Sequence, residues 1–152
     1  MASASAIWGR LEEAGMTEMQ AVAACSEETL TTCGLSRQKR RYARTLAESG
    51  IDFNALAEKP DVEIVKTLTA VTGIGVWTAE IYAMFSLGRS DLFAAGDLAL
   101  QEAAKLIYDM PERPSEKALR AQSEDWSPWR TVAAKLFWKY YHVVKEREGV
   151  RV

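Results

Sequence analysis

The first residues that could do chemistry are two glycines, Gly73 and Gly75, which bracket one aliphatic residue. Glycine adopts positive φ readily and lets another group approach the backbone closely. The amides after Gly75 open a predicted helix from Val76 to about Leu87, and a helix N-terminus favours a bound anion. The segment therefore predicts a hairpin between two helices that is suited to binding a phosphate.

A second candidate is Asp97, which follows a connector over Asp91–Gly96 and opens the next predicted helix. Its position has two interpretations. The carboxylate could be an ordinary N-cap that accepts hydrogen bonds from the amides of Ala99 or Leu100. It could also be a reactive group, because the helix start favours the ionised form. One carboxylate has two oxygens, so the two roles are compatible.

Two tryptophans fit either the core or a binding pocket. Trp77 lies on the nearly all-apolar helix that begins at Val76, together with Ile81 and Phe85, and we expect that helix to be central and buried. Trp138 lies off the apolar stripe of the last predicted helix, so it must pack on a second partner or face a cleft. The residues of that stripe follow helical spacing and are predicted to face the core: Trp129, Val132, Ala133, Leu136, Phe137, Tyr140, Tyr141 and Val144.

The remaining pattern predicts an all-α fold, because no run alternates with period two. Thr17, Ser26, Ser36, Ser115 and Ser127 are predicted N-caps, the last with proline at the first helical position. Pro60, Pro111 and Pro114 mark breaks between helices. The predicted helices cover residues 4–14, 17–24, 26–32, 36–49, 53–57, 62–68 and 76–87, then three more that start at 97, 115 and 127.

Composition limits the class of protein. The 152 residues, 48% of them hydrophobic, predict a single domain over 1–152. No apolar run has the length of a membrane span and no signal peptide is evident, so we expect no membrane association and a location in the cytoplasm or nucleoid, or in a eukaryotic nucleus. Cys25, Cys33 and His142 cannot complete a zinc or iron–sulfur site, and the thiols are expected to be reduced.

Charge is ambiguous as a guide to partners. The net charge of −2 and a pI near 5.5 argue against binding nucleic acid by bulk charge. Five cations nevertheless crowd one predicted helix, and they form either a solvated face or a local anion-binding surface. They are Arg37, Lys39, Arg40, Arg41 and Arg44.

Four motifs in order resemble the helix-hairpin-helix DNA glycosylase superfamily, and in particular its DNA-3-methyladenine glycosylase II branch. They are Gly73-Ile74-Gly75, Trp77-Thr78-Ala79, Ala95-Gly96-Asp97-Leu98 and Trp126-Ser127-Pro128-Trp129-Arg130; Gly34-Leu35-Ser36 with Lys39 also fits. The resemblance implies a helical domain with a cleft for an extruded base. It also implies repair of double-stranded DNA by cleavage of the N-glycosidic bond of damaged, often alkylated, bases.

The resemblance assigns roles in the chemical step. Asp97 matches the superfamily's catalytic aspartate, which stabilises positive charge on the sugar as the base leaves. Trp77 occupies the place where lyase-type relatives carry a lysine. Because tryptophan cannot form a Schiff base, the chain is expected to be monofunctional and to lack lyase activity. Trp77 and Trp138 match walls of the base pocket, and Ile81 replaces a tyrosine of the best-known member type.

The resemblance also assigns the DNA grip. The amides of Gly73, Gly75 and Thr78 would hold one phosphate. The main-chain carbonyls of Thr69, Val71 and Ile74 would hold a monovalent cation that bridges to it. No other cofactor is expected, and the protein is expected to be a monomer. Thr72 replaces the usual proline, which leaves the hairpin less stiff before folding.

Family members carry further helices and a wedge-bearing stretch before the segment that matches Ala2 to Leu11, so the domain is expected to be truncated at its N-terminus. This leaves an alternative of a different class: a noncatalytic helix-hairpin-helix module that binds DNA backbone or a protein. A third interpretation is a helical scaffold in which the glycine hairpin only connects two helices.

Overall fold

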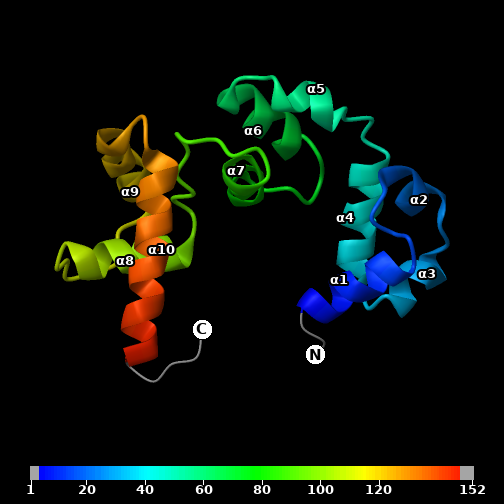
Figure 1. Cartoon of the computed structure of the whole chain (residues 1–152), viewed down its shortest axis with the longest axis horizontal. Coiled ribbons are helices and arrows are strands. Elements are labelled where there is room, and N and C mark those ends of the chain that lie inside the picture. Colours follow the sequence, from blue (N-terminus) through cyan, green and yellow to red (C-terminus); the bar gives the residue numbers. More distant parts are fainter. Residues whose placement is uncertain (1–3, 148–152) are drawn as a thin grey trace. The chain divides into compact units, whose positions relative to one another are not determined.

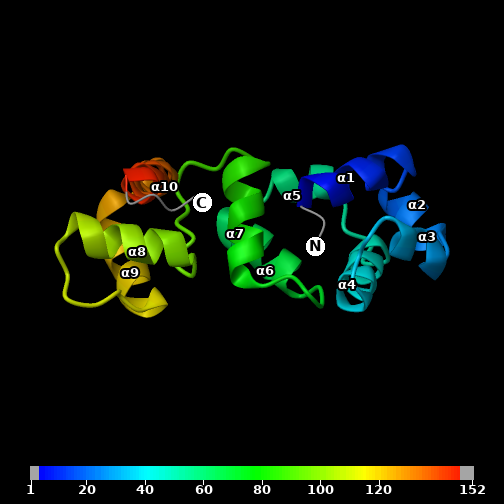
Figure 2. The same cartoon turned by 90° about the horizontal axis from the view of Figure 1, so that it is seen from below.

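A computed structural model describes residues 4–147, and every regular element within this range is helical, as the sequence pattern predicts. Contacts within the chain divide it into two units, drawn in Figures 1 and 2. The first unit runs through Leu56 and includes Thr69–Ile74. The second comprises Ala57–Leu68 and the chain from Gly75 onward. The expected single domain over 1–152 stays a prediction.

The first unit contains α1 (Ala4–Glu13), α2 (Met19–Ala24), α3 (Glu27–Thr32) and α4 (Arg37–Ala47). The hydroxyls of Ser26 and Ser36 accept hydrogen bonds from amides of the first turns of α3 and α4, so these caps are confirmed. The predicted cap at Thr17 is wrong. Helix α2 begins after Glu18, without a side-chain cap, because the preceding residues form a turn closed by the Met16 amide on the Leu11 carbonyl.

Helix α4 packs on α2 and α3, and Figures 1 and 2 show it running beside both. Leu30 of α3 is fully buried, and Cys33 is almost so. Arg44 reaches from α4 to donate to the carbonyls of Ala23 and Cys25 at the end of α2. This arginine therefore replaces part of the hydrogen bonding that a helix C-terminus lacks.

Helices α5 (Phe53–Ala57), α6 (Asp61–Thr69) and α7 (Val76–Phe85) follow close to their predicted bounds. Burial on α7 differs from the prediction: Ala79, Ala83 and Met84 are buried, whereas Val76, Trp77 and Phe85 are about half exposed. Hydrophobicity around the whole helix did not indicate which face would pack. The buried face carries Ala79, Glu80, Ala83 and Met84.

The second unit also contains α8 (Leu98–Ile107), α9 (Glu116–Ser123), a short 3₁₀ helix η1 (Glu124–Trp126) and α10 (Arg130–Arg147). Helix α8 packs on α9 and α10, with the connector before α8 inserted into the same core. The apolar spacing of Leu100, Ala103, Ala104 and Ile107 predicts the inner face of this helix; the first three are buried and Ile107 is exposed. The core of this unit consists of Met84, Phe93, Ala94, Ala95, Leu100, Ala103, Ala104, Leu119, Ala134 and Phe137.

Helix α10 begins later than predicted, and a different face of it is buried. It begins at Arg130, and the Ser127 hydroxyl donates to Asp91 instead of capping the helix. Thr131, Ala134 and Phe137 are buried, and Trp138 and Tyr141 pack on the same core. Four residues of the predicted core stripe are exposed instead: Trp129, Val132, Leu136 and Tyr140.

Hydrogen bonds explain which face of α10 is buried. The Thr131 hydroxyl bonds both the amide and the carbonyl of Leu92, and the Thr131 amide donates to the Ser90 carbonyl. Apolar residues lie on nearly all sides of α10, so spacing alone did not define its inner face. Among residues 4–147, no helix combines the length and the apolarity that crossing a membrane requires.

Candidate active site

The connector over 91–96 is held at both ends by side chains of the second unit. Arg130 forms a bidentate pair with Asp91, with its Nε 2.7 Å and its Nη2 3.0 Å from the carboxylate oxygens. Near the other end, the buried Gln101 side chain donates to the Ala95 carbonyl at 2.8 Å. Together with the Thr131 contacts, these bonds satisfy backbone groups of a buried loop. They fix the position of the loop that precedes Asp97.

Asp97 is the N-cap of α8, as one of the two interpretations predicted. Its Oδ1 accepts from the amides of Ala99 at 2.9 Å and Leu100 at 3.1 Å. The cap uses only one of the two carboxylate oxygens. The other, Oδ2, accepts from neither of these amides.

Both candidate tryptophans contact that carboxylate. The Trp77 indole Nε1 donates to Asp97 Oδ2 at 2.9 Å, and the Trp138 Nε1 donates to Oδ1 at 3.2 Å. Oδ1 thus accepts from three described donors and Oδ2 from one. The chain brings together residues that are 20 and 41 positions apart from Asp97, each on a different helix.

Aromatic side chains continue from this carboxylate along α7. The Trp77 ring is 47% exposed, so it does not belong to the core. The rings of Trp138 and Phe85 lie 5.7 Å apart, and the Lys135 ammonium lies 5.5 Å from the centre of the Phe85 ring. Ile81, the third predicted pocket residue, packs against the core cluster, and no contact places it on the Asp97 carboxylate.

A buried carboxylate near this site was not singled out from the sequence. Glu80, on α7, is 3% exposed and accepts from Arg120 of α9 at 2.6 Å. Burial raises the pKa of Glu80, against the opposing effect of the Arg120 guanidinium. Arg120 also pairs with Glu116, whose carboxylate lies against Gly96, the residue before Asp97. The only available signal was an acid inside an otherwise apolar helix.

The glycine hairpin has the backbone that the sequence predicts. Gly73 has a φ of 99°, and the Ile74 amide closes the turn on the Val71 carbonyl at 3.1 Å. Gly75 is the N-cap of α7 and has no side chain to fill the cap, so amides of the first turn, including Thr78, have no side-chain partner there. These amides are the kind of donors that bind an anion.

Of the predicted cation ligands, the Thr69 carbonyl is at the last residue of α6, and those of Val71 and Ile74 are in the turn that follows. They are oxygen donors, which suit a hard monovalent ion, and the Val71 carbonyl keeps a second lone pair after accepting from Ile74. No group of three His, Cys, Asp or Glu side chains in the described part of the chain could hold a metal ion.

The helices joined by a glycine hairpin define a helix-hairpin-helix protein with one carboxylate held by two indoles. The family model described as "HhH-GPD superfamily base excision DNA repair protein" matches residues 1–128. The chain belongs to this superfamily.

Similar proteins agree with that assignment. DNA-3-methyladenine glycosylase 1 of Schizosaccharomyces pombe is 31% identical over 129 residues, which are 82% of this chain and 57% of that protein. A crystal structure of DNA-3-methyladenine glycosidase from Bacillus halodurans has a TM-score of 0.81 and 38% identity, and the match covers 93% of this chain and 69% of that one.

A structure of the Schizosaccharomyces pombe enzyme Mag1 in complex with abasic DNA has a TM-score of 0.75 and 26% identity, over 88% of this chain and 69% of that one. The chain spans about half the length of the curated relatives it matches.

Proposed function

We propose that this chain is a monofunctional DNA glycosylase of the DNA-3-methyladenine type II branch, which hydrolyses the N-glycosidic bond of alkylated bases in duplex DNA. The observation that carries the proposal is the Asp97 carboxylate held between the indoles of Trp77 and Trp138. Several relatives are named DNA-3-methyladenine glycosylases, and one was solved with abasic DNA, which supports DNA as the partner.

The geometry suits a reaction with a cationic transition state. Loss of a base leaves positive charge on the sugar, and a fixed carboxylate stabilises that charge without having to reorganise. Oδ2 has the greater free acceptor capacity, because three of the four described hydrogen bonds go to Oδ1. We assign Oδ2 as the oxygen that faces the sugar.

The aromatic side chains suit the base. A base within a duplex must be extruded before chemistry, and it is then held by stacking. The half-exposed Trp77 ring and the Trp138–Phe85 pair offer flat surfaces beside Asp97. An alkylated base that carries positive charge gains about 0.5–2 kcal/mol from such a ring.

The strand grip is proposed at the hairpin. The amides of Gly73, Gly75 and Thr78 would bind a phosphate, and the carbonyls of Thr69, Val71 and Ile74 would hold a monovalent cation beside it. We further propose that the chain acts as a monomer where DNA resides, in a nucleoid or nucleus. Position 77 is a tryptophan and not a lysine, so the chain has no amine there that could attack the sugar. The product is therefore an abasic site in an intact strand.

A single-turnover assay tests this function. The full chain, in excess over duplex DNA that carries 3-methyladenine or hypoxanthine, is expected to release free base. The strand is expected to break only after alkali or heat. Strand cleavage without either treatment would refute the monofunctional assignment. Duplex binding with no base released from any alkylated or deaminated substrate would support the alternative, a noncatalytic helix-hairpin-helix module.

A further inference from the structure

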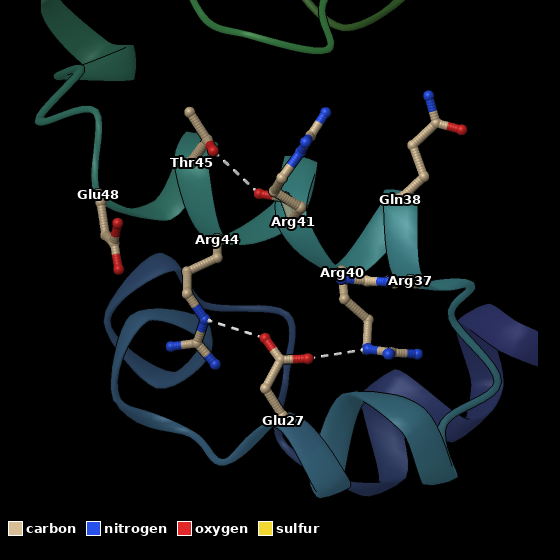
Figure 3. Close-up of a pocket in the computed structure, with 8 residues that line it drawn as sticks. All are labelled: Glu27, Arg37, Gln38, Arg40, Arg41, Arg44, Thr45 and Glu48. Carbon is tan, nitrogen blue, oxygen red and sulfur yellow. Dashed lines mark hydrogen bonds and ion pairs between the residues drawn. The ribbon is translucent and has the colours of Figure 1, made fainter.

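Helix α4 carries the cation cluster that the sequence left open, and its arginines differ in whether they pair with an acid. Arg40 and Arg44 point from α4 toward Glu27 of α3, as Figure 3 shows. Arg40 also donates to the Leu35 carbonyl, and Arg44 donates to the carbonyls of Ala23 and Cys25. These two arginines hold the first unit together, so for them neither a solvated face nor an anion-binding surface describes the role.

Arg37 and Arg41 have no carboxylate partner among the described residues, and both are exposed. They are four residues apart, which places them on one side of α4, about 6 Å apart along the axis. Figure 3 shows Arg41 with Gln38 and Thr45 on the side of α4 away from Glu27. This side offers the Arg41 guanidinium and the Gln38 amide together, whereas the Thr45 hydroxyl donates to the Arg41 carbonyl.

An open cavity of about 680 Å³ runs along α4 in this region. Its lining has four arginines and two glutamates, a local charge of +2 in a chain whose net charge is −2. One of the two acids, Glu27, is already paired with Arg40 and Arg44. The charge left over for a ligand is therefore positive. The lining residues are Glu27, Arg37, Gln38, Arg40, Arg41, Arg44, Thr45 and Glu48.

Tyr42 of α4 contacts Gly73, which belongs to the same unit. The Tyr42 ring lies so close over Gly73 that a Cβ at that glycine would overlap it. Gln38 donates to the Tyr42 hydroxyl at 2.6 Å, and the Arg41 guanidinium lies 5.5 Å from the centre of the Tyr42 ring. The aromatic ring orients Arg41 without neutralising its charge.

We propose that Arg37 and Arg41 form a second phosphate-binding site for the DNA backbone, in addition to the one proposed at the hairpin. This inference rests on the proposed function, because that function identifies DNA as the ligand. Guanidinium groups on an exposed helix face contact phosphate oxygens and carry no sequence information, which suits an enzyme that must scan DNA of any sequence. The Gln38 amide, which has a second N–H besides the one bonded to Tyr42, adds a neutral donor to the same site.

Salt dependence of binding tests the site without relying on catalysis. The Arg37→Gln/Arg41→Gln variant keeps good helix formers but loses both charges. Fluorescence anisotropy with a labelled undamaged duplex over a range of KCl concentrations should show the slope of log K against log salt reduced by about 1–2, because each phosphate contact contributes roughly 0.9. Affinity at low salt should fall at least tenfold.

Two further variants keep the result specific. Arg113→Gln/Lys117→Gln removes the same charge from exposed positions of the second unit and should leave the slope unchanged. Arg37→Lys/Arg41→Lys keeps both positive charges and should retain most of the salt slope. A variant that kept the charges but lost the slope would indicate misfolding. Thermal melting by circular dichroism checks that each variant is folded.

The outcomes separate this inference from the proposed function. Wild-type protein that releases base, with an unchanged salt slope in Arg37→Gln/Arg41→Gln, would overturn only the second phosphate site. An equal loss in the control variant would also overturn it, because the effect would then come from net charge. Wild-type protein that binds duplex but releases no base would refute the glycosylase and leave the phosphate site standing.

Discussion

Two aspartates six residues apart, Asp91 at the start of the connector and Asp97 just after it, have opposite electrostatic surroundings. Asp91 is paired with Arg130 through two hydrogen bonds and accepts another from the Ser127 hydroxyl. The Arg130 guanidinium holds the pKa of Asp91 below its usual value. Asp97 accepts from two backbone amides and two indoles, and no Lys or Arg among residues 4–147 forms an ion pair with it.

The difference separates an anchor from a candidate reactive group. A carboxylate with a guanidinium partner has its charge compensated, and its role is to tie the connector to α10. Neutral donors orient a carboxylate but leave its net charge in place. That charge is available to stabilise a cation that forms beside it, and this is the property the proposed reaction needs.

The largest expected effect is on base release by Asp97→Asn. The amide oxygen can still accept from Ala99 and Leu100, so the helix cap should survive while the charge is lost. Single-turnover base release is expected to fall about 10²–10³-fold. Asp91→Asn, measured per folded molecule, is expected to stay within about threefold of wild type. Equal losses in the two variants would remove the distinction between them.

The second expected effect is on the stability of Asp91→Asn. Loss of the charged hydrogen bonds to Arg130 should lower the free energy of unfolding by about 1–2 kcal/mol at neutral pH. Because folding lowers the Asp91 pKa from an ordinary 3.8, this contribution is complete above that value and disappears as the pH falls through the folded-state pKa.

Urea unfolding of wild type and Asp91→Asn at pH 7 and below pH 4 measures this contribution. The difference in unfolding free energy between the two proteins should shrink at the lower pH. A difference that stays the same across this range would mean that the Arg130 pair contributes through packing and not through the charge of Asp91.

The smallest expected effect is the difference in base release between Trp77→Phe and Trp138→Phe. Trp77→Phe keeps an aromatic ring but removes the only described donor to Oδ2, so that oxygen loses its orientation. One hydrogen bond is worth about 1 kcal/mol, or roughly a fivefold loss of base release. Trp138→Phe should cost less in the chemical step, because two amides still hold Oδ1. Rates at saturating enzyme compare the variants, and a larger chemical loss in Trp138→Phe would reverse the assignment of Oδ2.

Local signals predicted most helix boundaries, because they depend on residues within one turn. Ser26, Ser36, Asp97 and Ser115 all accept the amide bonds that their positions predicted. The connector and the glycine turn also follow from residues close in sequence. The exposed Trp129 and the late start of α10 were missed, because Ser127 bonds to Asp91, 36 residues away, instead of capping a helix.

The sequence by itself determined the all-helical fold, the glycine hairpin and the place of Asp97 at a helix start, because propensity, capping and glycine conformation act over a few residues. Only the tertiary structure decided that the indoles of Trp77 and Trp138 would meet on one carboxylate, that Glu80 would be buried against Arg120, and which face of α10 would turn inward. Those outcomes depend on hydrogen bonds between distant segments. The spacing of apolar residues along a helix that is hydrophobic on most sides does not predict these contacts or the buried face.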